Sequence, residues 1–246
     1  MSHRDGAQTQ PMTALHPLDR PAWGALTGRQ KPLALGAPPA LRFDPAFGPF
    51  AATADDSPES LAALAALIGA TESVVLLQAE ASPTPPGTRA VFQAGAVQMV
   101  AGSFSAPAHV ADIVELTGAD APEMLALATL TKPGPFSTRT HELGTFFGVR
   151  VNGVLAAMAG ERMRPDGYTE VSGVCTRPDH RGKGYGGRLT QMVASRIQAR
   201  GDVPFLHAMD DNPAAISLYE SLGFVIRRSF SVTVLVGEGA HAAPPH

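Results

Sequence analysis

Apolar residues recur along this chain in two patterns, one with helical spacing and one in short continuous runs. Between residues 57 and 69, leucines recur every three residues behind a Ser-Pro pair, which predicts a capped helix with one buried face. The run at 73–79 is continuous and of strand length, so it predicts a strand buried on both faces. A second short strand is expected at 96–100, and the Phe-containing stretch at 41–52 is expected to be irregular.

From residue 110 onward the pattern predicts the order β-α-β-β-β-α-β-α-β. An Asn-Gly turn at 152–153 joins two strand-like runs and is a strong hairpin signal. This order is mixed α/β (α+β), and we expect a twisted, mostly antiparallel sheet with a parallel strand pair in its middle. The predicted organisation is a smaller N-terminal α/β region at 1–109, a main domain at 110–237 and a tail at 238–246.

Composition narrows the class of protein. With 246 residues and 44% apolar content, the chain can bury a sizeable core. A net charge of −3 provides no basic surface for nucleic acid, so no nucleic-acid partner is expected. No apolar run reaches the roughly 18 residues of a membrane span, and the start of the chain lacks the apolar core of a signal peptide. We therefore expect a cytoplasmic protein without a membrane partner.

The cysteine and histidine residues give no indication of a disulfide-bonded protein or of a metalloprotein. The single Cys175 excludes an internal disulfide and suits a reducing compartment. The eight histidines are scattered, and no pair has metal-ligand spacing, so no metal is expected.

The stretch from Tyr168 to Gly187, YTEVSGVCTRPDHRGKGYGG, is the first candidate for chemistry. A strand-like run leads into a glycine loop that fits Arg/Gln-x-x-Gly-x-Gly, and a helical pattern follows at once. Such a loop can hold a phosphate group through backbone N–H groups at a helix N-terminus. It lacks the Ser/Thr of a Walker loop and the acidic residue of a dinucleotide fingerprint. Taken alone, the loop favours phosphate binding, with a simple tight turn as the alternative.

A second block, DNPAAISLYESLGF from Asp211 to Phe224, decides between these alternatives. It fits Asn-x-x-Ala-x-x-Leu-Tyr-x-x-x-Gly-Phe. Together the two blocks resemble the GNAT superfamily of acyl-CoA N-acyltransferases, and in particular its FR47-like subgroup. The resemblance covers about residues 110–236 and implies a GNAT-type sheet with a central splayed strand pair and flanking helices. Residues 1–109 match no known activity.

The resemblance implies a role for each matched residue. Backbone groups of the strand before the loop would pair with the pantetheine arm, and the loop would hold the pyrophosphate with Arg181 at its rim. Asn212 would touch the cofactor, and Tyr219 would protonate the leaving thiolate. The plainer alternative for Tyr219 is a core aromatic. The expected cofactor-binding residues are Val174, Cys175, Thr176, Arg181, Gly182, Lys183, Gly184, Tyr185, Gly186, Gly187 and Asn212.

Several residues are candidates for the general base that the attacking amine requires. Some members of the superfamily place a catalytic Glu where Glu170 stands, although an exposed strand-end carboxylate is the alternative. His207 stands where other members carry a Glu, and a satisfied core histidine is its alternative. Glu161 is a candidate anchor for the substrate amine, and a water chain to a distant base stays open.

The resemblance implies transfer of an acetyl group from acetyl-CoA, a cosubstrate, to a primary amine by direct attack in a ternary complex. The alternative is a non-catalytic acyl-CoA-binding or sensing module in which residues 1–109 do the work. The acceptor is a small molecule or a peptide; a protein N-terminus, an amino acid, a polyamine and an antibiotic all fit. A homodimer is left open.

Overall fold

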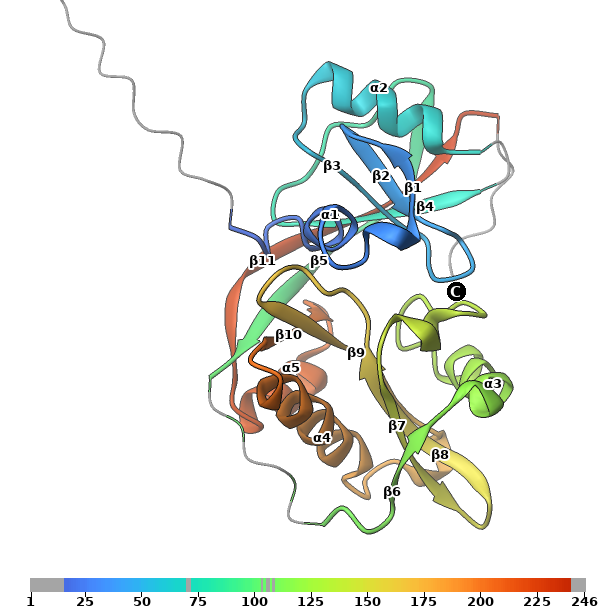
Figure 1. Cartoon of the computed structure of the whole chain (residues 1–246), viewed down its shortest axis with the longest axis vertical. Helices are drawn as coiled ribbons and strands as arrows, with labels where there is room; N and C mark the ends of the chain where they lie inside the picture. The colour runs from blue at the N-terminus through green and yellow to red at the C-terminus, as the bar shows by residue number, and fades with distance from the viewer. Residues whose placement is uncertain (1–15, 70–71, 103, 105–106, 108, 240–246) are drawn as a thin grey trace, which may run out of the picture.

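The computed structural model describes residues 16–69, 72–102, 104, 107 and 109–239, and Figure 1 shows the arrangement of their helices and strands. The described strands form one eleven-stranded sheet in the order β1-β2-β3-β4-β11-β5-β10-β9-β8-β7-β6. The N-terminal elements gather at one end of the molecule and α3, α4 and α5 at the other, with the long strands β5 and β11 running between them (Figure 1). Most of the expected tail lies outside the described residues.

The order of elements expected from residue 110 onward is confirmed, as is the mostly antiparallel sheet. Its central parallel pair is β9 with β10, and a two-residue turn at Asn152-Gly153 joins β7 to β8. The elements are β6 (Ile113–Leu116), α3 (Ala121–Thr131), β7 (Phe146–Val151), β8 (Val154–Glu161), β9 (Tyr168–Thr176), α4 (Tyr185–Ala199), β10 (Val203–Met209), α5 (Pro213–Ser221) and β11 (Phe224–Gly237).

The N-terminal region is more regular than its composition predicts. The stretch at 41–52 is irregular only in part: residues 44–49 form a turn, and on either side of it lie two antiparallel strands whose side chains are all buried, including Phe43 and Phe50. The strand expected at 96–100 is only the end of a 14-residue strand, because pairing with β11 extends it back to Thr88. The elements are α1 (Pro21–Thr27), β1 (Ala34–Ala37), β2 (Ala40–Phe43), β3 (Phe50–Thr53), α2 (Pro58–Leu67), β4 (Ser73–Gln78) and β5 (Thr88–Ala101).

Strand β5 ties the two regions together. It precedes residue 109, yet it lies between β10 and β11 and pairs with β11 along its whole length. The sheet therefore runs without interruption across the expected boundary between 1–109 and 110–237, and that division stays a prediction about how the chain is organised.

Alternating side chains on β7 show how the C-terminal helices cover the sheet. Phe146 packs with Met124 and Leu127 of α3, whereas its neighbour Phe147 packs with Leu189 of α4. Successive side chains of a strand point to opposite faces, so α3 and α4 lie on opposite sides of the sheet. Both helices contact β8 and β9, so these two strands lie between them.

A chain that begins at residue 110 tests whether the C-terminal region folds alone. Without β5, strands β10 and β11 lose the partner that joins them, so we expect this fragment to be insoluble or to lack native secondary structure. Far-ultraviolet circular dichroism and size-exclusion chromatography would check this against the full chain. A soluble, cooperatively unfolding fragment would instead support a domain boundary at residue 109.

Candidate active site

The parallel strands β9 and β10 pair over only three residue pairs, the last of which is Glu170 with Phe205. Beyond that point β10 pairs with β5, while β9 continues beside β8. The two strands therefore diverge, and the edge of β9 that faces β10 has no strand partner over residues 171–176 among the described residues. Unpaired backbone N–H and C=O groups on such an edge can bind an extended ligand as though it were another strand.

A bulge at Gly173 causes part of this divergence. Between the pairs Met158–Cys175 and Gly160–Ser172, the single residue Ala159 of β8 stands opposite two residues of β9, Gly173 and Val174. Gly173 has φ +63°, a left-handed conformation that glycine adopts without strain. An extra residue in one strand bends that strand and increases its twist, so β9 turns away from β10.

The glycine loop continues directly from this strand. Gly182 and Gly184 have φ values of +77° and +76°, and a side chain added to either would meet no atom within 4 Å. Gly184 immediately precedes α4, whose first N–H groups have no carbonyl partner within the helix. A Cβ on Gly186 would lie 3.8 Å from atoms of Val174 and Thr176, so the helix start and the free edge of β9 are adjacent. Together they form one open, N–H-rich surface that suits a phosphate group.

The basic residues of the loop differ in their availability. Arg181 forms no ion pair with a described residue, and Lys183 contacts only the ring of His180, with 3.0 Å between Nζ and Nδ1. Arg188 instead binds Asp112 and the carbonyl of His109. Arg181 and Lys183 can therefore add positive charge around a bound anion, whereas Arg188 ties down the segment before β6.

Tyr219 of α5 packs edge-on against Phe224 with 6.1 Å between ring centroids. Burial, with a further contribution from Cys175 of β9, raises the pKa of Tyr219 to about 12. The hydroxyl therefore keeps its proton at neutral pH and lies near the diverging end of β9. Burial also raises the pKa of the Cys175 thiol to about 11, so this thiol is a poor nucleophile. Asn212 caps α5, its Oδ1 accepting from the backbone N–H of Ala215 at 3.1 Å.

The two candidate bases lie together at the point where the strands part. Glu170 is buried and accepts two hydrogen bonds from Arg162, at 2.8 and 2.7 Å, while Nδ1 of His207 lies 2.8 Å from its Oε1. Burial acts to raise the pKa of Glu170, but the charge and hydrogen bonds of Arg162 and the hydrogen bond with His207 outweigh it and hold the pKa at about 2. The exposed strand-end alternative for Glu170 is therefore wrong.

Both ring nitrogens of His207 also lie within hydrogen-bond distance of a partner. Its Nε2 lies 3.1 Å from Nε2 of Gln98, whose Oε1 accepts from Arg227 at 2.9 Å. Because an amide nitrogen can only donate, Nε2 of His207 accepts and Nδ1 carries the proton donated to Glu170. Burial lowers the pKa of His207 despite the opposing effect of Glu170, so the ring is held neutral with both nitrogens bonded.

Sequence reasoning missed Arg162 and Gln98, which complete this buried network. A signal for Gln98 was present, because it is a polar residue within the apolar run AVQMV. The sequence alone does not show which side chains such a residue contacts in the folded protein. The third candidate, Glu161, is paired with Arg200 at 2.8 Å and is not bonded to Glu170 or His207.

The chain is similar to known proteins over the region that contains this site. A family model described as FR47-like protein matches residues 147–232, which include β9, the glycine loop and α5. A solved structure from Novosphingobium aromaticivorans, described as an acetyltransferase from the GNAT family, is 46% identical, with a TM-score of 0.86 over 91% of this chain and 99% of its own. The chain belongs to the GNAT family.

Two further relatives agree. A GCN5-related N-acetyltransferase from Kribbella flavida shares the fold, with 22% identity and a TM-score of 0.62 over 93% of this chain and 98% of its own. The N-alpha-acetyltransferase RimI of Mycobacterium tuberculosis is 35% identical over 100 residues, which are 37% of this GNAT chain and 61% of RimI. The chain thus spans less than two thirds of RimI. The expected GNAT, FR47-like membership is confirmed.

Two kinds of feature are absent from the described residues. None of the helices in that part of the chain is long and apolar enough to cross a membrane. Within the same residues, no group of three or more His, Cys, Asp or Glu side chains could hold a metal ion.

Replacing Glu170 by Gln should destabilise the fold by about 3–5 kcal/mol at neutral pH, because it leaves the Arg162 guanidinium buried without its counter-charge. The pKa of Glu170 falls from 4.5 to about 2 on folding, so its stabilising contribution is complete above pH 4.5 and is lost as the pH falls toward 2. Urea unfolding from pH 7 to pH 2 measures this.

The difference in unfolding free energy between wild type and Glu170→Gln should shrink across that acid window. Glu142→Gln, which removes an exposed partner of Arg139, is the control and should change stability little at any pH. A wild-type advantage that stays constant from pH 7 to pH 2 would contradict the assigned ionisation of Glu170.

Proposed function

We propose that this GNAT protein transfers an acetyl group from acetyl-CoA to a primary amine by direct attack in a ternary complex. The observation that carries the proposal is the free edge of β9, which leads from the buried Glu170 to the glycine loop at the start of α4. The relative RimI bears the name of an N-alpha-acetyltransferase, which favours an amine acceptor.

The residues present fit the cosubstrate. The loop from Gly182 to Gly187 and the first turn of α4 would bind its pyrophosphate, with Arg181 and Lys183 supplying charge. Backbone groups of Val174, Cys175 and Thr176 would bind the pantetheine arm. Asn212 would contact the cofactor through its side-chain amide group, whose oxygen already caps α5. When bound, acetyl-CoA would supply an activated acyl group as a thioester.

Tyr219 would act as the general acid. An acid must hold its proton until the thiolate leaves, and a pKa of about 12 keeps the hydroxyl protonated throughout the neutral range. Transfer through an acyl-cysteine is disfavoured because the buried Cys175 thiol, with a pKa of about 11, stays protonated. Direct attack by the amine is the route that these two groups support.

Neither of the two candidate bases, Glu170 and His207, is free to take the proton of the amine. Both oxygens of Glu170 and both nitrogens of His207 are engaged, and a carboxylate with a pKa of about 2 takes up protons poorly. We propose that these residues hold the point where β9 and β10 part and that the proton leaves to water. Holding the two reactants together would then supply much of the rate.

Tyr219→Phe tests the proposal, because it removes the acid without removing the ring that packs on Phe224. We expect kcat to fall about 10²- to 10⁴-fold, with little change in the KM for acetyl-CoA. The measurement is release of free CoA thiol with a panel of primary amines. Tyr168→Phe, the same change at the start of β9, is the control and should keep the wild-type kcat.

Two outcomes would contradict the proposal. If Tyr219→Phe keeps full activity, another group protonates the thiolate. If the wild type binds acetyl-CoA but acetylates none of the amines, the protein acts as an acyl-CoA-binding module.

A further inference from the structure

Two basic side chains at the glycine loop contact each other. His180 ends the one-turn 3₁₀ helix η4 (Pro178–His180), which leads directly into the loop, and Lys183 lies within the loop. The Nζ atom of Lys183 lies 3.0 Å from Nδ1 of His180, whose side chain is only 17% exposed. A cation and a titratable ring are thus held together where the loop would bind the pyrophosphate.

The contact specifies the charge of His180 in the free protein. An ammonium group has three donors and no acceptor, so Nδ1 of His180 accepts the hydrogen bond from Lys183. A ring that accepts at Nδ1 is neutral and carries its proton at Nε2. Nε2 lies 3.8 Å from Oδ2 of Asp179, a carboxylate that favours a proton on that nitrogen. His180 is therefore neutral while Lys183 occupies Nδ1.

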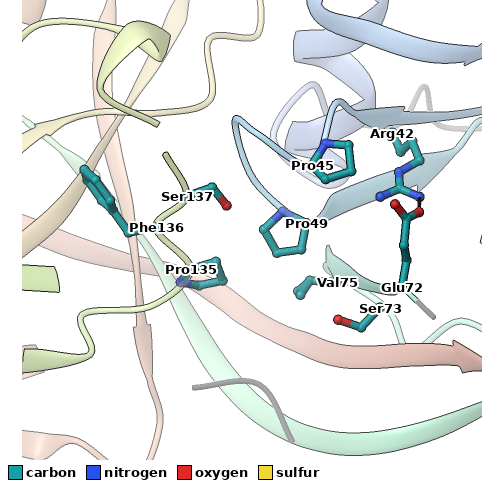
Figure 2. Close-up of a pocket in the computed structure, with 9 residues that line it drawn as sticks. All are labelled: Arg42, Pro45, Pro49, Glu72, Ser73, Val75, Pro135, Phe136 and Ser137. Carbon is teal, nitrogen blue, oxygen red and sulfur yellow. Dashed lines mark hydrogen bonds and ion pairs between the residues drawn. The ribbon is translucent and has the colours of Figure 1, made fainter. Parts of the chain in front are cut away.

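Lys183 is more available to an anion than cations that a carboxylate already holds. Arg42, at the edge of a cavity of about 330 Å³, donates to Oε2 of Glu72 at 2.6 Å, and Figure 2 shows these two side chains in contact. Arg188, in the first turn of α4, binds the carboxylate of Asp112. An anion that recruited either arginine would have to compete with a carboxylate. Among the described residues, Lys183 has only the neutral ring of His180 to leave.

A phosphate group at the loop would change both partners of this contact. The ammonium group of Lys183 would turn to the phosphate oxygens, because a charged acceptor binds it more strongly than an imidazole nitrogen does. Nδ1 of His180 would then lose its donor and be free to take up a proton. Histidine titrates close to neutral pH, so negative charge added beside the ring favours its protonated form.

Asp179 is the other charged group beside the ring of His180. Its carboxylate also favours the protonated ring, but it is 63% exposed and is shared with Arg177, whose Nε lies 3.3 Å from Oδ1. Solvent screening weakens such an exposed charge, so Asp179 does not outweigh the donor that Lys183 places at Nδ1. A bound phosphate would supply the further negative charge and remove that donor at the same time.

We infer that His180 is a further residue of the phosphate site. It is neutral and bonded to Lys183 in the free protein, and it is protonated beside the phosphate when the cosubstrate is bound. The proton comes from solvent, and no covalent bond of the cosubstrate changes. The inference rests on the proposed binding of pyrophosphate at the loop. It goes beyond that proposal because it makes the affinity for the acyl donor depend on pH.

The experiment uses 3′-dephospho-CoA as the probe and the full chain as the protein. This probe keeps the pyrophosphate of CoA but lacks the phosphomonoester, which would itself take up a proton near pH 6. Calorimetric titration at pH 7, in two buffers of different ionisation enthalpy, measures the protons taken up on binding. We expect a net uptake of a fraction of a proton. We also expect the affinity to rise about three- to tenfold from pH 8 to pH 6.

His180→Asn assigns the proton to this ring. Asparagine offers Lys183 an amide oxygen in place of Nδ1, but it does not titrate. We expect the proton uptake to disappear and the affinity to become independent of pH between pH 8 and pH 6. His141→Asn, the same change at a half-buried histidine of η3 (Thr140–Leu143), is the matched control and should keep the wild-type uptake.

The outcomes separate this inference from the proposed function, because none of the readouts requires turnover. Proton release, no net uptake, or an uptake that His180→Asn retains would overturn the inference and leave the proposed function intact. If 3′-dephospho-CoA does not bind the full chain, the phosphate site is wrong and the inference fails with it. If the variant does not fold or does not bind the probe, the NMR resonances of the His180 ring in the wild type decide. They should move toward the protonated form at pH 7 when the probe is added, and a ring that stays neutral overturns the inference.

Discussion

The short pairing of β9 with β10 is the constraint on which the rest of this structure depends. Parallel strands in the middle of a sheet would ordinarily pair along their length, but here β10 follows β5, its partner on the other edge, while β9 is bent by the bulge at Gly173. The free edge of β9 is the consequence, and the start of α4 lies beside it. A strand from the N-terminal region thus keeps open the gap in which we propose that the acyl donor binds.

A buried ionic network holds the point at which the strands part. Arg162, Glu170 and His207 join β9 to β10 there, and Gln98 extends the network to β5. Such a network is worth little as net stability compared with apolar packing, but losing one member is costly because the others stay buried and charged. Its value is in geometry: it fixes where the divergence begins.

How much the sequence predicted depended on how local each signal was. The order of elements after residue 110, the Asn152-Gly153 hairpin and the glycine loop follow from spacing within short stretches, and all are present. The position of β5 and the Glu170–Arg162 pair depend on which distant strands become neighbours, and a single sequence does not specify that.

Hydrogen exchange of the backbone amides, followed by mass spectrometry with and without CoA, tests the central claim most directly. If the arm of CoA lies along the free edge of β9, amides of residues 171–176 and of the first turn of α4 should exchange more slowly with CoA present, by a factor that grows with CoA concentration. Amides of β5 and β11, which pair with each other along their length, should change little. Protection confined to other strands, with residues 171–176 unchanged, would contradict the account.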